Sequence, residues 1–383
     1  MEYAITERKR KEYRATSNKS REAKKNALSG KGPKPIHPIN IPKLKPEKLM
    51  PVLPKNGLQA LSLFSGCGGL DLGFDLAGFT NQAAYDIISI CGETISQNNP
   101  NCKVFAGKEV GDVKKVDWSQ YKNKIDVIHG GPPCQPFSIN GQQKGTNDER
   151  NMWPQFIEAI TKIKPRAFVA ENVPGMMSPK FSKFIQDDIL SPLKNYKIKL
   201  LKLNAADFGV PQNRKRVVFV GFLKEKDALN FVEPEPTHTF EHLIGKIADS
   251  KVKLPKTMGV RQAIGLPNIG IDSLSPTIRS AFTGKRNTTS ILNGSSGQKL
   301  WSNIEIWPSG VAEDRKKARL YVPDNKHFRL SVQDCAVLQG FPSSWKFKGA
   351  VYQILGQIGN SVAPPVGYVV AKAVAKALTD SNH

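Results

Sequence analysis

Short apolar runs alternate with stretches of helical periodicity from residue 59 to about residue 222. Apolar runs of about four to eight residues are typical of buried strands, and strands that alternate with helices are typical of a parallel α/β sheet. The pattern therefore predicts an α/β fold. The predicted strands are Ala60–Phe64, Gln82–Asp86, Ile125–Ile128, Ala167–Ala170, Lys199–Asn204 and Val217–Phe222. The predicted helices are Leu70–Ala77, Ile88–Asn98, Trp153–Ile163 and Val366–Leu378.

Two parts of the chain lack this alternation. Residues 1–57 are dense first in charge and then in proline, and we expect a short helix at most in a largely disordered arm, because such a segment buries too little apolar surface. Residues 223–328 are rich in Gly, Ser, Thr and Asn at irregular spacing, which predicts a second, smaller, loop-rich domain. The α/β domain then covers residues 58–222, and residues 329–383 return to it.

The charge balance narrows the class of partner. Lys and Arg outnumber Asp and Glu by 56 to 33, which indicates a polyanion such as nucleic acid, although a merely basic soluble protein has the same balance. The arm holds 15 of the basic and 5 of the acidic residues, so it either adds phosphate contacts or only aids solubility. No membrane span or secretory signal is evident. Five cysteines without a Cys-x-x-Cys pair indicate neither disulfides nor zinc, and we expect a reducing, cytoplasmic setting.

A glycine-rich turn, residues 64–69, follows the first predicted strand and precedes a helix. This is where nucleotide-like ligands are held, because small residues let the ligand approach the backbone. The turn lacks the Gly-Lys-Ser/Thr ending of a phosphate-binding P-loop. Asp86 closes the second strand, where a carboxylate can accept hydrogen bonds from ribose hydroxyls, and Asp112 follows shortly after. Either acid also fits an ordinary turn or cap.

The run from Gly130 to Ser138 follows the third predicted strand. Two glycines and two prolines make a stiff bend that presents Cys134 at the carboxyl edge of the sheet, where open α/β folds place their chemistry. A free cysteine is more often a small core residue. The polar neighbours Gln135 and Ser138 favour an exposed nucleophile instead.

Two further strand ends carry charged side chains. Glu171 follows the strand Ala167–Ala170 and shares its sheet edge with Cys134. Arg214 and Arg216 alternate before Val217, so their guanidinium groups are expected to point the same way and converge on one site, unless they form only a solvated strand end.

Taken in this order, these blocks resemble the motifs of the cytosine-C5 DNA methyltransferase family from about residue 58 to residue 378. The resemblance implies an S-adenosylmethionine-dependent methyltransferase (Rossmann-like) sheet, a target-recognition domain at residues 223–328 and a mobile catalytic loop from Ser138 to about Asn151. It further implies double-stranded DNA as substrate, S-adenosyl-L-methionine as cofactor, S-adenosyl-L-homocysteine as product, no metal, and a monomer. The matching blocks are Phe64-Ser65-Gly66-Cys67-Gly68-Gly69, Gly131-Pro132-Pro133-Cys134-Gln135-Pro136-Phe137-Ser138, Glu171-Asn172-Val173, Gln212-Asn213-Arg214-Lys215-Arg216 and Gly359-Asn360-Ser361-Val362.

The resemblance assigns the cofactor to residues at the ends of the first strands and near the C-terminus. Many relatives carry Glu where this chain has Asp86, and both residues supply a carboxylate. Some relatives place an aromatic residue against the adenine at the position where this chain has Ile87. The implied cofactor-binding residues are Phe64, Ser65, Gly66, Cys67, Gly68, Gly69, Asp86, Ile87, Asp112, Val113, Asn360, Ser361 and Val362.

The resemblance also implies the chemistry. The target cytosine is flipped out of the duplex. The thiolate of Cys134 adds to C6, so that C5 can attack the methyl group. Glu171 contacts N3 and the exocyclic amine, Arg216 holds O2, and Arg214 supports the loop and the site. The implied DNA contacts are Gln135, Ser138, Thr277, Arg279 and Arg286.

Three other functions remain open at this point. A tRNA cytosine methyltransferase of the same family would carry a Cys-Phe-Thr signature in the recognition region, which this sequence lacks. A catalytically silent DNA-binding relative would not need Cys134, Glu171 and both arginines together. An unrelated S-adenosylmethionine enzyme for small molecules would leave the basic charge unexplained. By analogy, we expect the modification enzyme of a type II restriction-modification system whose cognate endonuclease acts separately.

Overall fold

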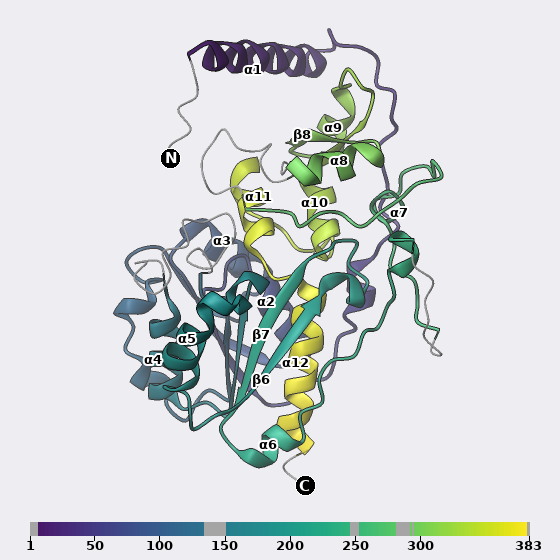
Figure 1. The fold of residues 1–383 in the computed structure, drawn as a ribbon. Coiled ribbons are helices and arrows are strands. Elements are labelled where there is room, and N and C mark those ends of the chain that lie inside the picture. The colour runs from purple at the N-terminus through teal and green to yellow at the C-terminus, as the bar shows by residue number, and fades with distance from the viewer. Residues whose placement is uncertain (1–6, 134–150, 246–252, 281–291, 293–294, 381–383) are drawn as a thin grey trace.

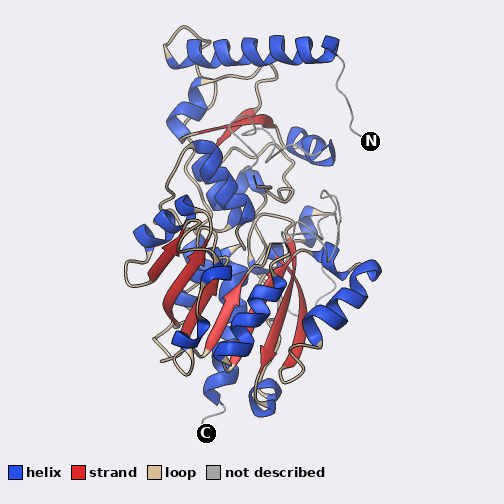
Figure 2. Ribbon diagram, turned by 90° about the vertical axis from the view of Figure 1, so that its left-hand side faces the viewer, coloured by secondary structure: helices blue, strands red, loops and turns tan. Residues whose placement is uncertain are grey.

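A seven-stranded sheet lies at the centre of the computed structural model, which describes residues 7–133, 151–245, 253–280, 292 and 295–380. The strand order is β3-β2-β1-β4-β5-β7-β6. Helices cover both faces of the sheet (Figures 1 and 2). The strands are β1 (Gln59–Leu63), β2 (Thr80–Asp86), β3 (Lys103–Ala106), β4 (Val127–Gly130), β5 (Ala167–Asn172), β6 (Lys197–Asn204) and β7 (Lys215–Phe222). The predicted α/β, Rossmann-like class is confirmed.

One strand departs from the expected parallel sheet. β7 pairs antiparallel with both β5 and β6. A parallel neighbour needs a crossover of about a dozen residues or more, whereas only residues 205–214 join β6 to β7. The short connection therefore folds back as a hairpin, and β7 runs against the other strands.

Each face of the sheet buries its own hydrophobic cluster. One face packs against α2 (Gly69–Leu76) and α12 (Pro364–Thr379), which also contact each other extensively. The other face packs against α4 (Trp153–Ile163) and the segment around α5 (Ser182–Phe184), which continues as a π-helical turn to Leu190. The remaining helices of the sheet region are α3 (Ser89–Asn98) and α6 (Glu225–Leu229).

A smaller unit stands at the carboxyl end of the sheet (Figure 1). Its two parallel strands are β8 (Ile306–Ala312) and β9 (Phe328–Ser331), flanked by α8 (Ser295–Asn303) and α9 (Arg315–Leu320). Three further helices, α7 (Val260–Ala263), α10 (Val332–Gln339) and α11 (Val351–Asn360), connect it to the sheet region. The proposed boundary at residue 328 falls at the start of β9, and the domain division itself stays a prediction.

The N-terminal arm differs from the expectation of a largely disordered segment. It begins with the 22-residue helix α1 (Glu7–Leu28). Its proline-rich part is tied to the body, because the Asn40 amide donates to Asp334 and Ile264 and the core buries Leu44 and Met50. The proline-rich part follows this path because a few apolar side chains dock on a surface that the rest of the chain provides. No helix within the described ranges is long and apolar enough to cross a membrane.

Candidate active site

Strand register brings the predicted motifs to one level of the sheet edge. Leu63 of β1 pairs with Gly130 of β4, which in turn pairs with Ala170 of β5. The next residue of each strand or turn therefore lies at the same edge, and these three residues are Phe64, Gly131 and Glu171. Three segments that are far apart in the sequence therefore meet at this edge through strand pairing.

The turn after β1 has the backbone of a ligand-binding loop. Phe64 adopts a left-handed conformation with φ 54°, which is strained for a residue with a side chain, and strain of this kind clusters at functional sites. The Gly66 N–H donates to Asp86 Oδ2 at 2.8 Å, so the turn is fixed to the end of β2. A Cβ on Gly69 would lie 2.0 Å from the hydroxyl oxygen of Ser361, and only glycine lets the segment after α11 close over the turn.

A cavity of about 360 Å³ opens beside this turn. Asp86 lies in its wall, and burial raises the pKa of this carboxyl despite two backbone N–H donors. Ile87, with 51% of its surface exposed, adds an apolar wall. Predicted residues that line the cavity are Phe64, Gly66, Asp86, Ile87, Asp112, Val113, Glu171, Arg216 and Asn360, together with Gly131, Pro132 and Pro133 before Cys134.

A second, smaller cavity of about 50 Å³ continues beneath the turn. Phe64, Gly131 and Glu171 border both cavities. The floor of the smaller one holds Asp71, on the first turn of α2. Neither carboxylate oxygen of Asp71 has a hydrogen-bond partner among the described residues, and burial raises the pKa of this carboxyl to about 7.

The raised pKa of Asp71 predicts a stability that falls as pH rises. Between the ordinary pKa of 3.8 and about 7, the folded protein holds a proton that the unfolded chain has lost, so unfolding is increasingly favoured toward pH 7. The decrease in the free energy of unfolding approaches about 4 kcal/mol above pH 7. Urea unfolding of the cofactor-free protein at pH 5 and pH 8 measures it. Asp71→Asn should flatten the dependence, and equal pH dependence in both proteins would contradict this origin.

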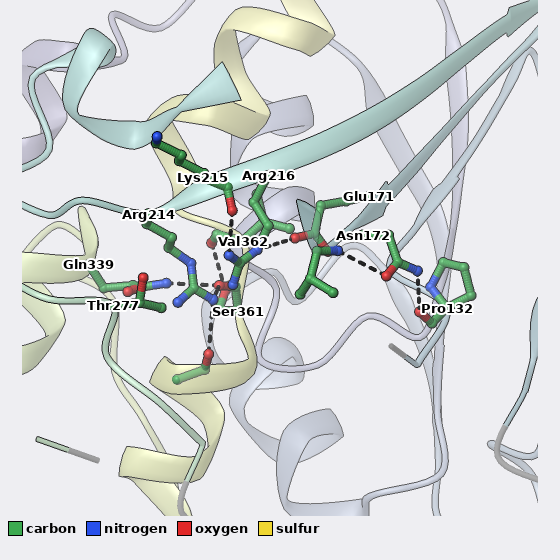
Figure 3. A network of polar contacts seen from close by, with 12 residues as sticks. Pro132, Glu171, Asn172, Arg214, Lys215, Arg216, Thr277, Gln339, Ser361 and Val362 are labelled. Carbon is green, nitrogen blue, oxygen red and sulfur yellow. Dashed lines mark hydrogen bonds and ion pairs between the residues drawn. The ribbon is translucent and has the colours of Figure 1, made fainter. Parts of the chain in front are cut away.

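Glu171 and Arg216 form the polar centre of the larger cavity. Arg216 Nε lies 2.5 Å from Glu171 Oε1, and each side chain is 12% exposed (Figure 3). A Cβ on Gly131 would lie 3.1 Å from Glu171 Oε2, so the glycine leaves room for this carboxylate. Next to it, the Asn172 amide donates to the Pro132 carbonyl and fixes the bend before Cys134 to β5.

Arg214 does not join Arg216 on the cavity. Its guanidinium is buried and donates to the carbonyls of Ile278, Gly359 and Ser361 at 2.6 to 3.0 Å (Figure 3). The expectation that both guanidinium groups converge on one site is therefore wrong. Arg214 precedes β7 instead of belonging to it, so strand alternation does not apply at this position. Its contacts are those of a support, because they join three segments around the cavity.

This contrast predicts different effects for the two arginines. Arg214→Ala should lower the free energy of unfolding by about 3 to 5 kcal/mol, because three buried carbonyls lose their donor and a cavity remains. Arg216→Ala should cost no more than about 1 to 2 kcal/mol, because its partner Glu171 faces an open cavity. Denaturant titration of both variants checks the order. Equal losses would contradict the supporting role of Arg214.

The four cysteines within the described ranges are unsuited to nucleophilic catalysis. Cys67, Cys91, Cys102 and Cys335 are all buried. Burial raises the pKa of Cys67 and Cys102 to about 12 and raises that of the other two as well, so the reactive thiolate is not formed near neutral pH. Cys134 lies outside the described residues, and the bend that carries it lines the cavity.

Comparisons with known proteins agree with this geometry. The family model of C-5 cytosine-specific DNA methylases matches residues 58–376. The chain belongs to this family. The type II methyltransferase M.NgoPII of Neisseria gonorrhoeae is 30% identical over 343 residues, which cover 84% of this chain and 97% of that protein. M.FnuDI of Fusobacterium nucleatum is 32% identical over 338 residues, covering 85% and 96%.

A solved structure supports the same assignment for the fold. A protein described as a DNA modification methyltransferase encoded within a prophage (E. coli) superposes with a TM-score of 0.51 at 27% identity, covering 85% of this chain and 99% of that one. The family match begins at residue 58, so helix α1 lies outside it.

Methylases of this family use S-adenosylmethionine, and the cavity residues fit that cofactor. Asp86 keeps acceptor capacity for ribose hydroxyls, and Phe64 and Ile87 offer apolar surface to a base. The smaller cavity reaches Ser361 and Val362, beside the first turn of α2. The sequence interpretation assigned no site role to Ile88, Cys91, Gly111, Met152, Val173, Gln357 or Gly359, which also line the larger cavity.

Several predicted residues lie off the cavities or outside the described ranges. Cys67 points into the core, where its thiol donates to the Gln357 carbonyl, and Gly68 and Gly69 serve the backbone of the turn. Thr277 donates its hydroxyl to the Asn213 carbonyl, while Arg279 is exposed. Outside the described residues lie Cys134, Gln135, Ser138 and Arg286.

Proposed function

We propose that this protein is a DNA (cytosine-5)-methyltransferase that modifies a flipped cytosine of duplex DNA. Family membership over residues 58–376 supports the reaction class. The observation that carries the proposal is the placement of Glu171, which borders both cavities and pairs with Arg216. Glu171 can therefore contact a base in the larger cavity, beside a methyl donor that extends from the larger cavity into the smaller one.

The cofactor has a natural place in the two cavities. Asp86, with Phe64 and Ile87, would hold its nucleoside portion, and Asn360, Ser361 and Val362 would border its amino-acid portion. When bound, S-adenosylmethionine supplies the methyl group that ends on C5.

The catalytic residues act on the cytosine in a defined order. The Cys134 thiolate forms a bond to C6, which places electron density on C5 and negative charge on the ring. Glu171 hydrogen-bonds N3 and the exocyclic amine and so stabilises that charge, while the Arg216 guanidinium faces O2. After methyl transfer the C5 proton leaves to a base, the C6–sulfur bond breaks, and the thiolate is restored.

Bisulfite sequencing of DNA from a methylation-deficient host that expresses the protein tests this function. We expect 5-methylcytosine at one short, fixed sequence, as in a type II restriction-modification system. In vitro, tritiated S-adenosylmethionine with duplex DNA or tRNA separates the alternatives. Label in tRNA alone would replace the proposal with a tRNA methyltransferase, and binding of DNA without label would indicate a silent relative.

The type II methyltransferases that this chain resembles support a proposal for its biological setting. We infer a monomeric, cytoplasmic modification enzyme whose cognate endonuclease acts as a separate protein on the same sequence. Sedimentation velocity at micromolar concentration would test the monomer, and protection of the modified DNA from a neighbouring endonuclease would test the pairing.

A further inference from the structure

Helix α1 is fixed to the small unit by a cation–aromatic contact. Lys24 Nζ lies 5.1 Å from the ring centroid of Trp307 and 5.6 Å from that of Tyr321. The Arg329 guanidinium lies against the same two rings, at 5.9 and 5.4 Å. Ala27, one turn on, is buried. The C-terminal part of α1 is thereby held against β8 and α9, and its direction is set.

An exposed side of α1 carries a line of positive charge. Lys11, Arg14, Arg21 and Lys25 recur at intervals that place them on one helical face, and all four are exposed. They are called the α1 stripe below. The anchoring residues Lys24 and Ala27 lie on a different face, so docking does not cover the stripe. The helix Glu7–Leu28 contains nine basic and three acidic residues, which gives it a net charge of +6.

The position of α1 suits a long, rod-like partner. Figure 1 shows the helix crossing the end of the molecule farthest from the C-terminus, with its N-terminal half projecting past the small unit on the side of α3 and α11. These two helices supply Cys91, Gln357 and Asn360 to the wall of the larger cavity. From Lys11 to Lys25 the stripe spans about 21 Å, the rise of about six base pairs.

We propose that the α1 stripe is a second, sequence-independent contact surface for duplex DNA, which binds backbone phosphates beside the segment that enters the active site. The inference rests on the proposed function, since it takes duplex DNA as the substrate. Charge complementarity identifies the partner: Lys and Arg at regular spacing on a rigid helix match the repeated charges of a phosphate backbone. The helix would add affinity without changing which base is modified.

The test compares two variants with the same loss of charge. The first replaces the stripe by glutamine (Lys11→Gln, Arg14→Gln, Arg21→Gln, Lys25→Gln), which keeps helix propensity. The control replaces four exposed lysines at the opposite end of the molecule, on or beside α6 and α12 (Lys224→Gln, Lys226→Gln, Lys372→Gln, Lys376→Gln). Binding of fluorescein-labelled duplexes of about 14 and 30 base pairs is measured by anisotropy across a salt series.

We expect the stripe variant to bind the long duplex about tenfold more weakly than the unaltered protein near 0.1 M salt. The slope of log affinity against log salt concentration should be less steep by about 2 to 3.5 for this variant. With the short duplex, the difference in affinity between the variant and the unaltered protein should be smaller. The control should retain both the affinity and the slope. Circular dichroism of the two variants should match, which excludes loss of the helix.

Equal binding by the stripe variant and the control would overturn the inference, whether or not the protein methylates DNA. A stripe-dependent salt slope in a protein that methylates no DNA would instead sink the proposed function and leave the DNA-binding helix in place. An unchanged kcat of the stripe variant at saturating duplex is the result expected of a surface that only binds.

Discussion

Cys134→Ser should abolish methyl transfer to duplex DNA, with a fall in kcat of at least about 10⁴-fold. A hydroxyl is a far weaker nucleophile at C6 than a thiolate, and the four cysteines within the described ranges are buried with raised pKa values. None of these four cysteines can therefore replace Cys134 as the nucleophile. Single-turnover transfer of tritium from labelled cofactor to a duplex that carries the identified site measures the loss.

Binding distinguishes a chemical loss from a damaged fold. The Cys134→Ser variant should bind S-adenosylhomocysteine by calorimetry, and duplex DNA by anisotropy, within about threefold of the unaltered protein. Cys102→Ser is the matched control, because this buried thiol lines neither cavity. Retained turnover in the Cys134 variant, or an equal loss in the control, would remove Cys134 from the mechanism.

Glu171→Gln should lower kcat by about 10² to 10³-fold while KM for DNA changes less than tenfold. The amide keeps the shape of the side chain but cannot carry the proton or the charge that the ring requires at N3. It also ends the ion pair with Arg216. Pre-steady-state methylation at saturating duplex separates kcat from binding.

The control for Glu171 is Glu158→Gln on α4. Glu158 pairs with Lys162 one turn on, and both side chains are about half exposed. Loss of such a surface pair changes stability by less than about 1 kcal/mol and should leave kcat unchanged. A Glu171 variant with normal kcat would show that the carboxylate only shapes the cavity wall.

The sheet and its edge could be predicted from sequence because local signals agree there. The helix Trp153–Ile163 was predicted at its observed bounds, since its apolar face and both ends are encoded locally. Six strands were found within about two residues of their limits. The motif residues at these strand ends then follow from register, because parallel strands level with one another end at one edge.

Features that depend on distant partners could not be predicted in the same way. The strands β3 and β9 are only four residues long, and β8 is interrupted by Pro308 and Gly310, so none of the three has a clear strand pattern in the sequence. The buried position of Arg214 depends on carbonyls from residues 278 to 361, which its neighbours in sequence do not indicate. The helix α1 is polar along most of its length, and its docking depends on two aromatic rings about 280 to 300 residues later.

Covalent capture tests the central claim most directly. A duplex with 5-fluorocytosine at the target position allows attack at C6 and methylation, but fluorine cannot leave as the proton does, so the adduct persists. Denaturing electrophoresis should show one protein–DNA species of additive mass that requires S-adenosylmethionine and is absent with Cys134→Ser, and peptide mass spectrometry should place the bond on Cys134. Efficient methylation of ordinary duplex with no trapped species, or trapping through another residue, would contradict the account.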